Sequence, residues 1–157
     1  MSESKPKVAF YWCSSCGGCE ESIVDLGADI LKVVAAVDIV FWPVALDFKK
    51  KDVEAMPDKS IAVSFINGGI RMSEQEEMAH LLRRKSQIIV AHGSCAHLGG
   101  IPGLANFWNK ATIFRKVYHT TVSTANPAAA EPLTKSSVDG HELTLPVVDG
   151  RGRTADE

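Results

Sequence analysis

Four short apolar runs, separated by longer polar stretches, constrain what this chain can fold into. They cover Lys7 to Trp12, Ile39 to Leu46, Ser60 to Ile66 and Gln87 to Ala91. Their apolar residues are continuous rather than alternating, which is typical of strands buried on both faces of a parallel sheet. Pro43 lies inside the second run, so we expect that strand to end or bend there.

Helical signals occupy the stretches between these runs. After the first run, apolar residues along one helical face occur at Ile23, Val24, Ile30, Leu31 and Val34. They predict a helix from Glu20 to about Val37. Ser73 and Glu76 form the pattern of a capping box and predict the start of a second helix, and a short third helix is expected over 109–118. Residues 47–59 are charged and are expected to form a loop.

Strands that alternate with helices predict an α/β fold with a parallel sheet covered on both faces. A chain of 157 residues fits one such domain, which we place at residues 5–118. Residues 119–157 are rich in Thr, Ser, Ala, Pro and Gly. They predict a loop-rich C-terminal extension whose end is disordered or truncated.

Composition excludes several classes of protein. The net charge is −2, so no overall basic field attracts nucleic acid. No apolar run approaches the roughly 18 residues that a membrane span needs, and the N-terminus lacks the apolar stretch of a secretory signal. These features predict a cytoplasmic protein, in which clustered cysteines more often bind metal than form disulfides.

The four cysteines occupy two loops that each follow a predicted strand. Cys13, Cys16 and Cys19 lie after the first strand, and Cys95 lies in the loop from His92 to Gly103 after the fourth. The carboxyl ends of parallel strands meet at one edge of a sheet, so we expect the two loops to converge. Four thiolates suit an iron–sulfur cluster or a zinc ion.

Glycines border these cysteines and are expected to let the backbone wrap closely around a bound group. Gly17 and Gly18 would leave amide N–H groups free to point at sulfur, and Gly93, Gly99 and Gly100 would give the same room around Cys95. A thioredoxin-like dithiol, a structural zinc site and an inert, buried Cys95 are the competing interpretations. His92 and His97 flank Cys95, and structural roles are favoured for both.

Two motifs resemble those of a known family. Cys16-Gly17-Gly18-Cys19-Glu20-Glu21-Ser22 resembles the CxGCxxS signature of nickel–iron hydrogenase small subunits, which share their fold with the 20 kDa subunit of NADH:ubiquinone oxidoreductase. The segment from Gly93 to Gly103 resembles the family's second motif, a G-x-C-A segment leading to GGIPG. The likeness runs from about Lys7 to Leu145. It is greatest to the small subunit of the methyl-viologen-reducing hydrogenases associated with heterodisulfide reductase.

The resemblance implies a flavodoxin-like domain in which Cys16, Cys19 and Cys95 ligate a proximal [4Fe-4S] cluster. It also implies a nickel–iron large subunit as partner, with further iron–sulfur or heterodisulfide-reductase-type subunits downstream. Glu21 matches an acidic position with either a helix-start or a proton-transfer role. The chain lacks the two CxxC pairs of a nickel–iron site, so we expect no catalysis by it alone.

The family's fourth ligand lies in a later P-G-C-P segment that this sequence lacks. Either the chain is truncated or divergent there, or Cys13 takes the fourth position, or the cluster is incomplete or absent. The sequence therefore predicts an electron-transfer subunit of a hydrogenase complex. The alternatives are a complex-I-like quinone-coupled subunit, a zinc-stabilised interaction module, and a degenerate subunit with only a structural role.

Overall fold

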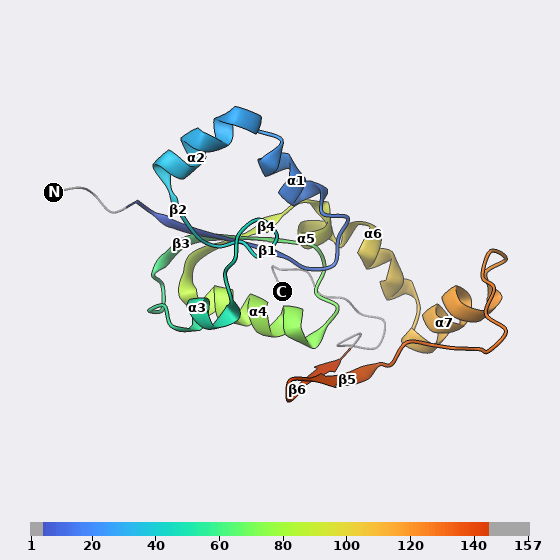
Figure 1. Ribbon diagram of the computed structural model, residues 1–157. Helices are drawn as coiled ribbons and strands as arrows, with labels where there is room; N and C mark the ends of the chain where they lie inside the picture. The colour runs from blue at the N-terminus through green and yellow to red at the C-terminus, as the bar shows by residue number, and fades with distance from the viewer. Residues whose placement is uncertain (1–4, 145–157) are drawn as a thin grey trace.

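A four-stranded parallel sheet forms the centre of the computed structural model, which describes residues 5–144 (Figure 1). Its strands are β1 (Lys7–Trp12), β2 (Asp38–Phe41), β3 (Ile61–Asn67) and β4 (Ser86–His92), in the order β2-β1-β3-β4. All neighbouring strands are parallel. The predicted α/β class is therefore confirmed, and β2 ends before Pro43 as expected. The predicted disordered or truncated end, residues 145–157, lies outside the described residues.

Helices cover both faces of the sheet (Figure 1). One face carries α1 (Gly18–Val24), the 3₁₀ turn η1 (Gly27–Asp29) and α2 (Ile30–Ala36), and the other carries α3 (Lys50–Glu54) and α4 (Ser73–Lys85). The single helix predicted from Glu20 to Val37 is thus interrupted. Gly27 has φ +55°, a left-handed conformation that a right-handed α-helix does not contain.

Two further local predictions are corrected. Residues 47–59 contain α3 rather than only a loop, and the Asp52 carboxylate accepts a hydrogen bond from the Lys49 amide at its start (2.7 Å). Helix α4 begins at Ser73, but its N-cap is Met72. Gln75 Oε1 accepts the Met72 amide (3.1 Å), so the predicted pairing of Ser73 with Glu76 is wrong.

The core lies in two layers, one on each side of the sheet. The layer beneath α3 and α4 contains the fully buried side chains of Ala9, Val53, Ile61 and Leu82. The layer beneath α1 and α2 is smaller and centres on Phe10 and Trp42, whose rings lie 4.7 Å apart. Successive residues of β1 alternate between the two layers, as the pleat of a strand requires.

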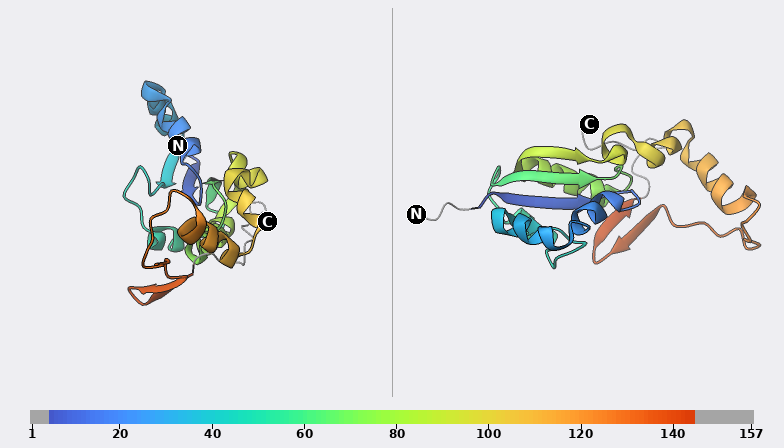
Figure 2. Two further views of the ribbon diagram at one scale, coloured as in Figure 1. Left: turned by 90° about the vertical axis from the view of Figure 1, so that its right-hand side faces the viewer. Right: turned by 90° about the horizontal axis from the view of Figure 1, so that it is seen from above.

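The chain beyond β4 leaves the sheet through a series of short helices (Figure 2). These are α5 (Ser94–Leu98), α6 (Gly100–Gly103), η2 (Leu104–Phe107), α7 (Lys110–Phe114) and the π-helical η3 (Arg115–Thr120). The predicted loop from His92 to Gly103 is therefore largely helical, and the helix predicted at 109–118 corresponds to α7 and η3. No helix among the described residues has both the length and the apolarity that a membrane crossing requires.

The extension expected to be loop-rich contains a hairpin of β5 (Lys135–Val138) and β6 (His141–Thr144). Asp139 and Gly140 form its turn, both with positive φ, which is a favoured sequence for a two-residue hairpin loop. The Thr144 amide donates to Ser73 Oγ (2.9 Å). The hairpin is therefore attached to the start of α4.

Candidate metal centre

The two cysteine loops lie at the same edge of the sheet, where β1 and β4 end (Figures 1 and 2). Cys16 is exposed on the turn before α1, and Cys19 is half-buried in the first turn of that helix. Cys95 is half-buried in α5, directly after β4. The structure thus brings together the two loops that are 76 residues or more apart in the chain.

Gly93 joins the two loops. A Cβ atom built on Gly93 would lie 2.1 Å from the sulfur of Cys19. Gly93 also has φ +83°, which L side chains rarely adopt. Only glycine therefore fits here, because the sulfur of the first loop occupies the space that a side chain of the second loop would need. The sequence placed Gly93 around Cys95, whereas the structure places it against Cys19.

Two other glycines face the remaining sulfurs. A Cβ on Gly100 would lie 2.8 Å from Cys95 Sγ, and one on Gly18 would lie 3.6 Å from Cys16 Sγ. Gly17 packs instead against the ring of Trp12, which a Cβ on Gly17 would meet at 2.8 Å. A Cβ on Gly99 would meet the backbone of Gly103 at 3.3 Å. Gly99 therefore does not border Cys95, contrary to the prediction.

The charges of the neighbouring sulfurs affect Cys19. Burial raises the pKa of Cys19, and the neighbouring sulfurs of Cys16 and Cys95, followed by the carboxylate of Glu20, raise it further. Like charges disfavour ionisation when they are close. Three thiolates at this edge would therefore need a positive counter-charge, such as that of a metal ion.

Cys13 has a different environment. It is 5% exposed and belongs to the core layer beneath α3 and α4. Burial, followed by the charge of Glu20, raises its pKa to about 12. This environment opposes the thiolate form that metal ligation requires.

A third loop, which contains no cysteine, holds the first cysteine turn in place. Ser14 and Gly69 exchange two backbone hydrogen bonds of 2.9 Å, and the Cys13 amide donates to the carbonyl of Asn67 (2.8 Å). Gly68 (φ +90°) lies so close to this turn that a Cβ would meet the Cys13 carbonyl carbon at 2.8 Å. This loop was not among the candidate site residues identified from the sequence.

Glu20 is a buried carboxyl group that sequence reasoning assigned to a helix start. Its side chain is 3% exposed. Trp42 Nε1 donates to its Oε2 (3.3 Å), while Oε1 has no hydrogen-bond partner among the described residues. Burial raises its pKa, which the Trp42 hydrogen bond partly offsets. Glu21, the residue that the family motif singles out, is exposed.

The two histidines near Cys95 make contacts within the fold. The ring of His92 lies edge-on to Phe65, with centroids 6.0 Å apart. The backbone amide of His97 donates to the Gly93 carbonyl (3.1 Å), and its side chain is exposed. Within residues 5–144, no three His, Cys, Asp or Glu side chains are grouped to hold a single metal ion. In a four-iron cluster, by contrast, each cysteine binds a separate iron, so its sulfurs need not converge on one point.

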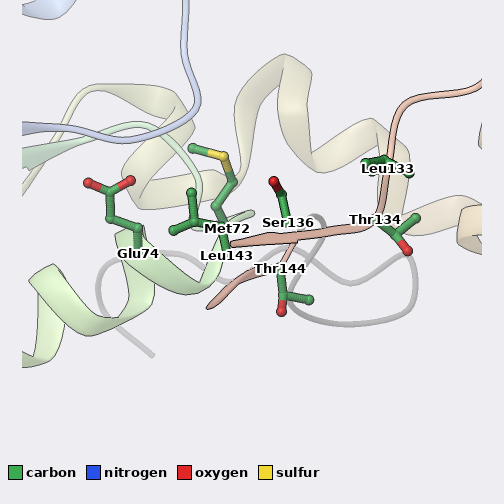
Figure 3. A pocket seen from close by; sticks show the side chains of 7 residues that line it. All are labelled: Met72, Glu74, Leu133, Thr134, Ser136, Leu143 and Thr144. Atoms are coloured by element: carbon green, nitrogen blue, oxygen red, sulfur yellow. The ribbon is translucent and has the colours of Figure 1, made fainter. Parts of the chain in front are cut away.

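A pocket of about 190 Å³ lies between the hairpin and the start of α4 (Figure 3). Its described lining is Met72, Glu74, Leu133, Thr134, Ser136, Leu143 and Thr144. This lining combines apolar and polar side chains and contains neither cysteine nor histidine. The candidate metal centre therefore does not extend into this pocket.

Curated proteins similar to this chain are subunits of hydrogenases. The chain is 41% identical over 152 residues to the iron–sulfur subunit of the F420-non-reducing hydrogenase of Archaeoglobus profundus, covering 96% of this chain and 47% of that protein. It is 35% identical over 128 residues to a subunit of the F420-non-reducing hydrogenase of Methanothermobacter marburgensis, covering 82% and 40%. The chain thus spans less than half the length of these two relatives.

A solved structure shares the fold. A chain in the crystal structure of an NAD⁺-reducing [NiFe]-hydrogenase in the H₂-reduced state matches with a TM-score of 0.73 at 23% identity, covering 97% of this chain and 76% of that chain. The family described as NADH ubiquinone oxidoreductase, 20 Kd subunit, matches residues 16–147, a range that includes Cys16, Cys19 and Cys95. The predicted family is confirmed: the chain belongs to that of the NADH ubiquinone oxidoreductase 20 Kd subunit.

Proposed function

We propose that this chain is the iron–sulfur electron-transfer subunit of a nickel–iron hydrogenase complex, with Cys16, Cys19 and Cys95 as ligands of a [4Fe-4S] cluster. The observation that carries the proposal is the contact between Cys19 Sγ and Gly93, because it unites the two cysteine loops. The names of the two hydrogenase relatives support the assignment.

The residues around the three sulfurs fit such a cluster. Gly18, Gly93 and Gly100 each border one cysteine sulfur, so none of these three positions has a side chain that would compete with a cluster for the sulfurs. Thiolates are the ligands that iron–sulfur clusters prefer. When bound, a [4Fe-4S] cluster accepts and releases single electrons. The rigid sheet beneath the loops would hold the three cysteines in fixed positions while it does so.

Three cysteines leave one of the four positions of a cubane cluster to another ligand. Cys13 is the fourth cysteine of the chain and is the candidate for this position within it. Its burial and raised pKa oppose this role. We therefore propose Cys16, Cys19 and Cys95 as the primary ligands. Whether Cys13 is the fourth ligand is tested separately with Cys13→Ser.

An exposed apolar surface next to Cys95 supports docking of a large partner subunit. The helices after Cys95 carry five apolar side chains that are each more than half exposed: Leu98, Ile101, Leu104, Phe107 and Trp108. Several exposed apolar side chains along consecutive helices are typical of protein interfaces. We propose that the nickel–iron large subunit docks here, within electron-transfer range of the cluster.

Iron and acid-labile sulfide analysis of anaerobically purified protein tests the ligand assignment. We expect about four irons per chain in the wild type, and a large loss in Cys16→Ser and Cys95→Ser. Ser94→Ala, which alters the exposed neighbour of Cys95, should keep its iron. A comparable loss in Cys13→Ser would make Cys13 the fourth ligand. Wild-type iron content in both ligand variants would exclude the proposed cluster site.

Copurification with a nickel–iron large subunit tests the partner. Ile101→Asp should weaken the complex because it places a charge in the apolar surface. Val122→Asp, at an exposed apolar position in the extension, is the control. A large subunit that retains its nickel ligands would also reject the complex-I-like alternative. Zinc instead of iron, without broad visible absorption, would favour the zinc-stabilised module.

A further inference from the structure

Asn67 lies at the carboxyl end of β3, in the centre of the edge where the cysteine loops meet. It pairs with Trp12 at the end of β1 and with His92 at the end of β4. Residues in register on neighbouring parallel strands share a face, and Trp12 packs against Gly17 of the cysteine turn. Asn67 is 1% exposed. Its side chain is therefore buried beneath the first cysteine turn.

One atom of the Asn67 amide is used within the fold. Ser15 Oγ donates to Asn67 Oδ1 (2.6 Å), and the Gly17 amide donates to Ser15 Oγ (3.2 Å). The Gly17 bond occupies a lone pair of the hydroxyl and leaves the hydroxyl proton for Oδ1, which is consistent with this orientation of the amide. Through Ser15, Asn67 thus holds the turn between Cys13 and Cys19.

The other atom of the amide lacks a partner. Asn67 Nδ2 is buried and has no hydrogen-bond acceptor among the described residues. Buried donors without acceptors are rare because they lose their hydrogen bonds to water without compensation. Nδ2 is bonded to the same carbon as Oδ1, which touches the cysteine turn. Its missing acceptor is therefore to be sought at this turn.

We propose that Asn67 Nδ2 donates a hydrogen bond to a sulfide of the bound cluster, so that Asn67 is a positioning residue that also tunes the cluster. The inference rests on the proposed function. A donor to sulfur stabilises the reduced, more negative cluster and therefore raises its reduction potential. Asn67 would connect the third loop, which has no cysteine, to the redox chemistry of the other two.

Pulsed EPR of the reduced cluster tests the proposal directly, in full-length protein labelled with ¹⁵N only in asparagine side-chain amides. The wild type should show coupling of the cluster to one labelled nitrogen. Ser15→Ala removes the partner of Oδ1 and keeps Nδ2, so the coupling should remain. Asn67→Leu should lose it.

The same three proteins are compared by redox titration. At a fixed potential, Asn67→Leu should show a reduced-to-oxidised ratio about tenfold lower than wild type, which is about 59 mV for a one-electron couple. Ser15→Ala should change this ratio much less, since it affects only the support of the turn. An equal shift in reduction potential in both variants would mean that Asn67 only supports the cysteine turn, and it would overturn the proposal.

The outcomes separate this inference from the function on which it rests. A wild-type protein that binds no iron contradicts the proposed function. An iron–sulfur cluster without coupling to an asparagine amide contradicts only the role of Asn67. If Asn67→Leu fails to assemble a cluster, the coupling in wild type and Ser15→Ala still decides the question.

Discussion

Replacing Gly93 by alanine would place a methyl carbon 2.1 Å from the sulfur of Cys19. Ordinary contact begins at 3.4 Å, so the sulfur or the second loop must move by roughly 1 Å or more. Metal–ligand distances tolerate deviations of only about 0.2 Å. We therefore expect Gly93→Ala to lose most of its iron. The positive φ at this position adds a backbone strain of about 1–3 kcal/mol.

Gly140→Ala is a matched control for the backbone strain. Gly140 has φ +82°, against +83° for Gly93, but a Cβ there would meet nothing within 4 Å. Urea unfolding of the metal-free proteins should show a loss of about 1–3 kcal/mol in Gly140→Ala and a larger loss in Gly93→Ala, where the contact with Cys19 adds to the backbone strain. Iron and sulfide analysis after anaerobic reconstitution should show a loss in Gly93→Ala alone. Full iron content in Gly93→Ala, or an equal loss in Gly140→Ala, would refute the reasoning.

Three further predictions concern the metal-free protein. Mass spectrometry after brief alkylation at pH 8 should find Cys16 modified and Cys13 protected, since Cys16 is exposed and burial raises the Cys13 pKa to about 12; equal labelling would contradict the burial. Burial raises the folded-state pKa of Glu20, so the protein loses stability as the pH rises through that pKa. Glu20→Gln should therefore melt at a higher temperature than wild type at pH 7, with the difference vanishing below the ordinary glutamate pKa of about 4.3; a pH-independent difference would argue against a buried charge. Leu82→Ala should cost about 2–5 kcal/mol in urea unfolding, because Leu82 is 0% exposed beneath α4; a change below about 1 kcal/mol would indicate a loosely packed core.

The sheet was predictable because its strands are rich in apolar residues, most fully in the central strands β1 and β3, although Ile88 of the edge strand β4 is exposed. Continuous apolar runs at Lys7 to Trp12, Ser60 to Ile66 and Gln87 to Ala91 each correspond to a strand within about one residue. The parallel arrangement followed from the helices between them. The meeting of the two cysteine loops followed in turn, since parallel strands end at the same edge.

Local features that depend on single residues were less predictable. Gly27 divides the expected first helix because its backbone is left-handed. The apolar periodicity continues on both sides of Gly27 and therefore did not indicate the break. Helix α3 lies in a charged stretch. The Asp52 carboxylate, three residues after Lys49, caps its start, and an acidic residue at this spacing could have been recognised as a helix signal. The turn at Asp139 and Gly140 is likewise a strong hairpin signal.

The interior of the site required coordinates. The spacing of cysteines identified the candidate ligands, but it gave no information on which glycine faces which sulfur. The contact of Gly93 with Cys19, the burial of Glu20 and the unpartnered amide of Asn67 all result from packing between segments distant in sequence. Such contacts are determined by how the helices and loops pack on the sheet rather than by local pattern.

X-ray absorption at the iron edge of the anaerobically prepared protein tests most directly whether sulfurs from both loops hold one cluster. We predict a first shell of sulfur and a second shell of iron in the wild type, with the iron–iron shell lost in both Cys16→Ser and Cys95→Ser. An iron–iron shell unchanged by either substitution, or zinc in place of iron, would contradict the account.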